Sequence, residues 1–136
     1  MKKIVMMLVV VLMAAGCNKE KVYKDNLNGE WTLYKYLLYN TDKTSVFQSR
    51  FPNYTITFSD ASTFSEFYTN PDSVNISGTY SFEDNLEKIV LENQYLDLTD
   101  SLTKTYKREY TIFNLTKTHV QLRNDTSQLY LSKTPE

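Results

Sequence analysis

The chain has 136 residues, of which 15 are Lys or Arg and 16 are Asp or Glu, so its formal net charge is −1 at pH 7. Such a balance gives neither the basic patch of a nucleic-acid-binding protein nor the acidic block of a disordered tail. The chain contains one Cys and one His, too few for a disulfide framework or a zinc site of Cys and His ligands, and its sequence shows no nucleophile elbow. We therefore expect no enzymatic activity, no metal, no cofactor and no nucleic-acid partner.

Residues 1–16 have the three parts of a secretory signal peptide. A pair of lysines forms the positive region, residues 4–15 are an unbroken apolar run, and small residues precede a cleavage point. A membrane-spanning helix needs about 20 apolar residues, so this run is too short to remain as a span. Cys17, the only cysteine, follows directly after the small residues at positions 14–16.

This arrangement resembles the lipobox of bacterial lipoprotein precursors, although Ala14 stands where Leu is commonest. The resemblance implies that Cys17 carries a diacylglycerol, that cleavage follows Gly16, and that the new amine is acylated. Two or three acyl chains, at about 0.8 kcal/mol per buried CH₂, would hold the protein on a membrane. An ordinary signal peptide with a chance cysteine is the alternative.

We expect a lipid-anchored protein of the outer membrane. Lys19 and Glu20 resemble a surface-export signal, with a mixed-charge tether as the other interpretation.

Residues 17–26 are predicted to form a flexible, lipidated tether, and residues 27–136 a single domain. The chain has 11 Tyr and 7 Phe, residue types that favour a pleated, half-buried surface. Alternating apolar residues predict a first strand from Leu27 to Tyr39. The segment 41–51 carries apolar side chains and is expected to fold back over the domain. Further strands are predicted over 52–58, 63–69, 76–82, 88–98, 103–113, around 120–122 and around 129–131.

Eight short strands joined in sequence by short turns predict an all-β fold, an up-and-down antiparallel meander. Closure into an eight-stranded barrel would remove the two unpaired edges, so we favour a barrel over a sandwich. Such a barrel is just wide enough to be filled by side chains or to hold one small ligand. The inward-facing residues are predicted to be Leu33, Tyr54, Ile56, Phe58, Tyr80, Phe82, Tyr110, Ile112, Val120, Leu122, Leu129 and Leu131.

Several landmarks along this domain point to one family. Gly29-Glu30-Trp31 matches the Gly-x-Trp that opens the first strand of lipocalins, and the later landmarks are Tyr54-x-Ile56-x-Phe58, Gly78-x-Tyr80, Tyr110-x-Ile112 and Leu129-Tyr130-Leu131-x-Lys133. The chain from Leu27 to Lys133 therefore resembles the small lipocalin-like domains of bacterial lipoproteins. It departs from lipocalins proper in lacking a Thr-Asp-Tyr motif before the seventh strand. It also has no arginine on the last strand, where Lys133 is the nearest candidate.

The resemblance implies that Trp31 plugs one end of the barrel, with Lys133 lying across its ring. It further implies a small apolar or amphipathic ligand inside the barrel or at its mouth under the 41–51 loop. The candidate cavity residues are Tyr54, Ile56, Phe58, Tyr80, Phe82, Tyr110 and Ile112. The alternative function is a protein-interaction module with a filled barrel, which would contact an envelope protein as an inhibitor or as a subunit of an outer-membrane complex.

The remaining candidate sites are weaker. Ser73 and Ser101 lie in Asp-Ser-apolar sequences that resemble sites of a bacterial O-glycosylation system, with chance and turn chemistry as the alternative. Glu66 and Glu109 show no pairing in the sequence that suggests acid–base catalysis. His119, the sole histidine, is predicted to face outward.

Overall fold

The computed structural model describes residues 19–133, so the predicted signal peptide and Cys17 lie outside the described residues. Residues 19–27 are helical. The other elements in chain order are β1 (Gly29–Leu38), β2 (Thr41–Asp42), α2 (Thr44–Arg50), β3 (Thr55–Phe58), β4 (Thr63–Thr69), β5 (Ser73–Glu83), β6 (Lys88–Asp97), β7 (Leu102–Phe113), β8 (His119–Arg123) and β9 (Ser127–Lys133). None of the helices within 19–133 is long and apolar enough to cross a membrane.

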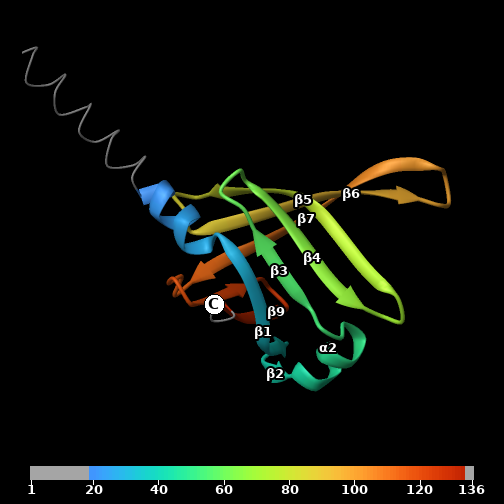
Figure 1. The fold of residues 1–136 in the computed structure, drawn as a ribbon, viewed down its shortest axis with the longest axis horizontal. Helices are drawn as coiled ribbons and strands as arrows, with labels where there is room; N and C mark the ends of the chain where they lie inside the picture. The colour runs from blue at the N-terminus through green and yellow to red at the C-terminus, as the bar shows by residue number, and fades with distance from the viewer. Residues whose placement is uncertain (1–18, 134–136) are drawn as a thin grey trace, which may run out of the picture.

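Eight of these strands close into an antiparallel barrel (Figure 1). Each strand from β3 to β8 pairs with the next strand in sequence, β1 pairs with β3, and β1 also pairs with β9. The closing seam runs from Trp31 opposite Lys133 to Leu38 opposite Ser127. The short strand β2 only extends the end of β1. The predicted eight-stranded, up-and-down barrel is therefore confirmed.

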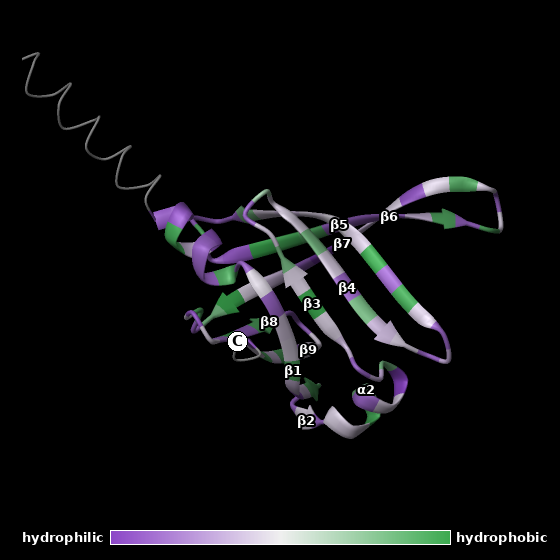
Figure 2. Cartoon of the chain, viewed as in Figure 1, coloured by the Kyte–Doolittle hydropathy of each residue, from purple (hydrophilic) through white to green (hydrophobic). Residues whose placement is uncertain are grey.

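The core forms where the alternating residues turn inward. Ile56 and Phe58 on β3 are buried, and so are Val120 and Leu122 on β8. Figure 2 shows the same alternation of hydrophobic and hydrophilic residues along the longer strands. Because successive side chains of a strand point to opposite faces, this pattern fills the interior and leaves the polar residues outside. The interior cluster also includes Leu33, Phe64, Tyr80, Ile89, Leu91, Tyr110, Leu129 and Leu131.

The segment before β1 differs from the flexible tether predicted for it. Its helix covers the end of the barrel at which β1 begins (Figure 1). Leu27 is fully buried, and the ring of Tyr23 meets the ring of Phe82 edge-on, with 6.0 Å between the centroids. Residues four apart lie on one face of a helix, so two apolar residues suffice to dock a segment that is otherwise polar.

The opposite end of the barrel is less regular. β5 pairs with β6 only over Gly78–Glu83, whereas β6 pairs with β7 as far as Asp97 opposite Leu102. The outer part of this hairpin, residues 94–105, is therefore paired only within itself and projects from the barrel (Figure 1). We call it the β6–β7 ribbon. Its exposed apolar residues are Tyr95, Leu96, Leu98 and Leu102.

Candidate functional site

The two ends of the barrel differ in how they are filled. At the end where β1 begins, Trp31 is fully buried, and its indole N–H donates to the carbonyl oxygen of Leu27 at 2.7 Å. The ammonium of Lys133 lies 5.1 Å from the centroid of the Trp31 ring. Helix 19–27 covers these residues from outside, so this end is closed by side chains.

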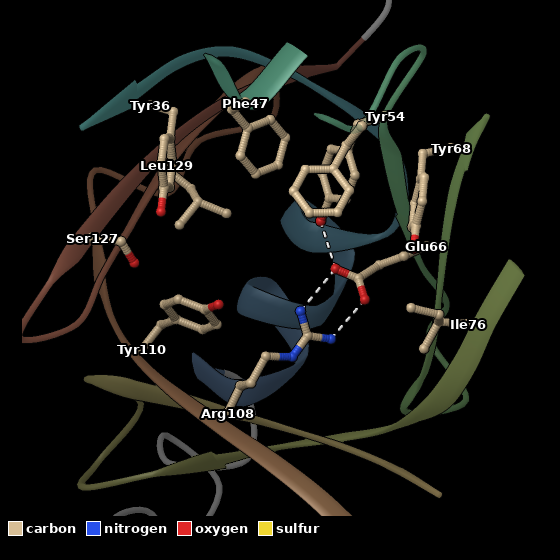
Figure 3. Close-up of a pocket in the computed structure, with 11 residues that line it drawn as sticks. Tyr36, Phe47, Tyr54, Glu66, Tyr68, Ile76, Arg108, Tyr110, Ser127 and Leu129 are labelled. Carbon is tan, nitrogen blue, oxygen red and sulfur yellow. Dashed lines mark hydrogen bonds and ion pairs between the residues drawn. The ribbon is translucent and has the colours of Figure 1, made fainter. Parts of the chain in front are cut away.

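The end beside α2 holds a pocket of about 190 Å³ (Figure 3). Most of its wall is aromatic, and the lining comes from β1, α2, β4, β5, β7 and β9 and from the segment between α2 and β3. The lining residues are Tyr36, Phe47, Phe51, Tyr54, Glu66, Tyr68, Ile76, Arg108, Tyr110, Ser127 and Leu129. The pocket therefore combines apolar rings with hydroxyl groups and one pair of opposite charges.

Helix α2 is fixed over this pocket by local hydrogen bonds. The backbone N–H of Thr44 donates to Asp42 Oδ1 at 2.9 Å, and the backbone N–H of Tyr36 donates to Thr44 Oγ1 at 3.0 Å. At the other end of the helix, the Asn70 side-chain amide donates to the carbonyl oxygen of Arg50 at 2.8 Å. The start of α2 is thereby tied to β1 and its end to the β4–β5 turn.

Phe47 is the residue by which α2 contacts the interior. Its ring centroid lies 4.9 Å from that of Tyr36, 5.2 Å from that of Tyr54 and 4.9 Å from that of Phe51. Aromatic pairs at such separations are attractive beyond the area they bury. The expectation that the 41–51 segment folds back over the domain is therefore confirmed, and Phe47 forms part of the pocket wall.

A buried ion pair crosses the barrel at the pocket. Arg108 Nη1 donates to Glu66 Oε1 at 2.9 Å, and Arg108 Nη2 donates to Glu66 Oε2 at 2.6 Å, a bidentate geometry (Figure 3). The hydroxyl of Tyr54 donates to the same Glu66 Oε1 at 2.6 Å. The side chain of Glu66 is 4% exposed and that of Arg108 is 19% exposed. Both carboxylate oxygens are thus satisfied inside the barrel.

The surroundings of Arg108 favour its charged form. Burial alone lowers the pKa of Arg108, but the hydrogen bonds and the negative charge of Glu66 outweigh that effect and raise the pKa. Burial, together with the charge of Glu66, raises the pKa of Tyr54 well above its ordinary value. Burial also raises the pKa of Tyr110, against the lowering effect of the Arg108 charge. Both phenols therefore remain neutral at physiological pH.

Arg108 has donors beyond those that Glu66 uses. Its guanidinium lies 5.7 Å from the ring centroids of Phe64 and Tyr106, within the range of a cation–π contact. Its Nε–H is buried and has no hydrogen-bond partner within the described residues. A buried donor left without an acceptor costs free energy, and this one belongs to a residue that lines the pocket.

Comparisons with known proteins agree with this architecture. Residues 27–122 match the family described as the lipocalin-like domain. The chain belongs to the lipocalin-like domain family. No curated protein matches it.

Solved structures carry the same lipocalin-like fold. The barrel is similar to the crystal structure of a lipocalin-like protein from Bacteroides uniformis, with a TM-score of 0.62 and 15% identity over 80% of this chain and 99% of that one. It is also similar to the structure of an uncharacterized protein from Bacteroides eggerthii, with a TM-score of 0.57 and 14% identity over 79% of this chain and 99% of that one. At these identities the likeness concerns the fold alone.

The seven predicted cavity residues occupy two different places in the lipocalin-like barrel. Tyr54 and Tyr110 line the pocket. The other five do not line it and lie in or against the core: Ile56, Phe58 and Tyr80 are buried, while Phe82 and Ile112 are partly buried and pack against the buried cluster. Within the described residues, the interior is thus filled toward the Trp31 end, and the pocket lies at the α2 end.

Sequence reasoning missed the pairing of Glu66 with Arg108. Glu66 lies opposite Ile56 on the neighbouring strand β3, a residue predicted to face inward. Arg108 has the same parity on β7 as Tyr106, Tyr110 and Ile112. That parity was a usable signal for an inward-facing arginine, but 42 residues separate the two partners in sequence.

The remaining candidates lie on the surface of the lipocalin-like domain. Ser73 begins β5, Ser101 lies in the turn of the β6–β7 ribbon, and both are exposed. His119 is exposed as well. Among residues 19–133, no group of three or more His, Cys, Asp or Glu side chains is placed to hold a metal ion.

Proposed function

We propose that this lipocalin-like protein is a lipid-anchored envelope protein, and not an enzyme, that binds a small amphipathic ligand in the pocket beside α2. The observation that carries the proposal is the pocket itself, about 190 Å³ in volume, with aromatic walls and a buried, hydrogen-bonded ion pair. Ligand sites are typically concave and mostly apolar, with a few placed polar groups.

The energetics of the ion pair support a role in binding. A buried salt bridge is weak evidence for stability, because its desolvation cost can exceed the attraction between the charges. Hydrophobic side chains fill the rest of the barrel, and they would fill this end as well. Polar groups retained at the hollow end are more easily explained as contacts for a ligand.

The pocket can be tested with protein from its own host. The barrel and its core are complete within residues 19–133, so residues 19–136 can be purified as a soluble domain and examined by native mass spectrometry. We expect a co-purified small molecule. Ile76→Trp, which fills the pocket, should abolish it, whereas Val74→Trp on the same strand, outside the pocket lining, should retain it. A bare mass for the unmodified domain contradicts ligand binding.

The lipid anchor has a separate test, because Cys17 lies outside the described residues. Labelled palmitate supplied to the host should enter the full-length protein and sediment with it in the membrane fraction. Cys17→Ala should remove both the label and the sedimentation. An unlabelled wild-type protein would restore the ordinary signal peptide as the better interpretation of residues 1–17.

One observation favours the second candidate function, a protein-interaction module. The β6–β7 ribbon exposes Leu96, Leu98 and Leu102 by 58%, 86% and 60%. Exposed apolar clusters often mark interaction sites. Cross-linking in intact cells followed by mass spectrometry should give a partner that disappears in Leu98→Asp and remains in Ile76→Trp. Loss of the partner in both variants, or in neither, contradicts a role for the ribbon.

A further inference from the structure

The charges of the pocket indicate which ligands it accepts. We infer that the pocket selects amphipathic ligands with a neutral polar head, such as an amide or an alcohol, and rejects those with a carboxylate. The inference rests on the proposed function and adds the chemical class of its ligand.

The charges that line the pocket balance each other. Among the described residues that line the pocket, Glu66 and Arg108 are the two charged ones, and their formal charges cancel. The other polar groups are the hydroxyls of tyrosines and of Ser127, and the pKa values of Tyr54 and Tyr110 are raised, which keeps both neutral. A charged head entering this site would lose its hydration without meeting an unpaired opposite charge.

The geometry of the ion pair also disfavours a ligand carboxylate. Arginine binds carboxylates best through two parallel N–H···O bonds, and Glu66 already occupies both Nη atoms of Arg108 in that way. A ligand carboxylate would have to displace Glu66 or come to rest beside it. Since the Glu66 side chain is only 4% exposed, two carboxylates there would repel each other with little screening by water.

Two polar groups of the pocket remain able to bind a neutral head. The Nε–H of Arg108 has no acceptor within the described residues, so a carbonyl or hydroxyl oxygen of the ligand can satisfy it. The hydroxyl proton of Tyr54 is donated to Glu66, which leaves the Tyr54 oxygen as an acceptor for an N–H or O–H of the ligand. A head that both donates and accepts fits these groups, while Phe47 and Leu129 take the apolar chain.

The volume sets the size of the probes. A cavity of 190 Å³ corresponds to about six water molecules at liquid density, which suits a short alkyl chain with a small head. Octanamide, octanoate and octylammonium share such a chain and differ in the charge of the head. Isothermal titration calorimetry of residues 19–136 at neutral pH compares the three directly.

For the unmodified domain we expect octanamide to bind at least about tenfold more tightly than octanoate or octylammonium, since burying an uncompensated charge is costly. Glu66→Gln frees the Arg108 charge, so octanoate should gain about tenfold or more in affinity while octanamide changes little. The matched control is Glu109→Gln on the outer face of β7, where the side chain is 51% exposed, and it should alter none of the affinities.

The outcomes separate the two proposals. Octanoate or octylammonium binding the unmodified domain as tightly as octanamide overturns the selectivity and leaves ligand binding in place. Binding of none of the three probes, together with a bare mass in the native experiment, overturns both. The comparison within the unmodified domain needs no variant, so it decides the inference even if Glu66→Gln fails to fold by circular dichroism.

Discussion

Replacing Arg108 by Met tests how the barrel tolerates the charges at its hollow end. The variant keeps an unbranched apolar stem but leaves the Glu66 carboxylate, 4% exposed, with the Tyr54 hydroxyl as its remaining hydrogen-bond partner among the described residues. Removing one partner of a buried ion pair costs about 3–5 kcal/mol, because the other charge stays buried and uncompensated. We therefore expect Arg108→Met to lower the free energy of unfolding by that amount.

Two further variants show whether burial is the cause. Lys107→Met removes an exposed partner of Glu92, where the two charged atoms are 3.9 Å apart and both side chains are 47% exposed, and surface pairs are worth about 0–1 kcal/mol. Combining Glu66→Leu with Arg108→Met removes both buried charges. Replacing a buried ion pair by apolar side chains often leaves the free energy of unfolding unchanged or raises it by about 1–4 kcal/mol. Here the Tyr54 hydroxyl would lose its acceptor, which lowers the free energy of unfolding by about 1–3 kcal/mol.

Urea unfolding of residues 19–136, followed by circular dichroism and by the fluorescence of Trp31, measures all three variants. The wild type, Lys107→Met and the double variant should lie within about 3 kcal/mol of one another in free energy of unfolding, and Arg108→Met should be the least stable of the four. An Arg108→Met variant no less stable than Lys107→Met would refute the reasoning. So would a double variant as unstable as the single one.

The other predictions address the closed end, the β5–β6 junction and alkaline pH. Trp31→Ala empties a fully buried site and should cost about 3–5 kcal/mol in urea unfolding; an unchanged melting temperature contradicts the plug. In Gly78→Ala the new Cβ would lie 2.0 Å from the carbonyl oxygen of Glu92, so we expect a loss of about 1–3 kcal/mol or more and faster amide exchange in β5 and β6. Burial raises the pKa of Tyr80 to about 12 from 10.0. The stabilising contribution of the neutral Tyr80 is therefore present below pH 10 and is lost as the pH rises through 12. The pKa is measured as the difference in phenolate absorbance between the wild type and Tyr80→Phe during an alkaline titration.

Most of the barrel could be predicted from the sequence because a strand with one buried face alternates every second residue. The predicted strand over 63–69 coincides with β4, and nine of the twelve predicted inward residues are buried. Helix 19–27 was not predicted because the segment is mostly polar. Its two docking residues, Tyr23 and Leu27, can be recognised only when the barrel end that they contact is known. The short helix α2 lay in a segment whose apolar residues predicted contact with the core but not its conformation.

The pocket could be predicted only in part, because the strand register decides which side chains meet inside the barrel. Tyr54 and Tyr110 were placed inside by their parity, but the pairing of Glu66 with Arg108 depends on the curvature and register of four strands, β4 to β7. The projection of the β6–β7 ribbon has the same origin. β5 pairs with β6 only from Gly78 onward, and no local pattern in either strand marks where their pairing stops.

The position of helix 19–27 gives the proposed lipoprotein an orientation. Cys17 precedes Lys19 by two residues, which span at most about 7 Å, and helix 19–27 lies at the closed end of the barrel (Figure 1). The ten residues of β1 separate that end from α2 by about 30 Å. A lipid on Cys17 would therefore hold the closed end against the bilayer and turn the pocket and the β6–β7 ribbon toward the aqueous side.

Energy transfer to an acceptor dye in the bilayer measures this orientation. Lys117 is exposed in the turn before β8, next to the closed end, and Ser101 is exposed at the ribbon tip. With Cys17 lipidated as proposed, Lys117→Cys and Ser101→Cys would each provide one free thiol for a donor dye on the full-length protein in nanodiscs. We expect clearly stronger transfer from position 117 than from position 101. Equal transfer, or stronger transfer from position 101, contradicts the orientation and would mean that ligands reach the pocket from the membrane side.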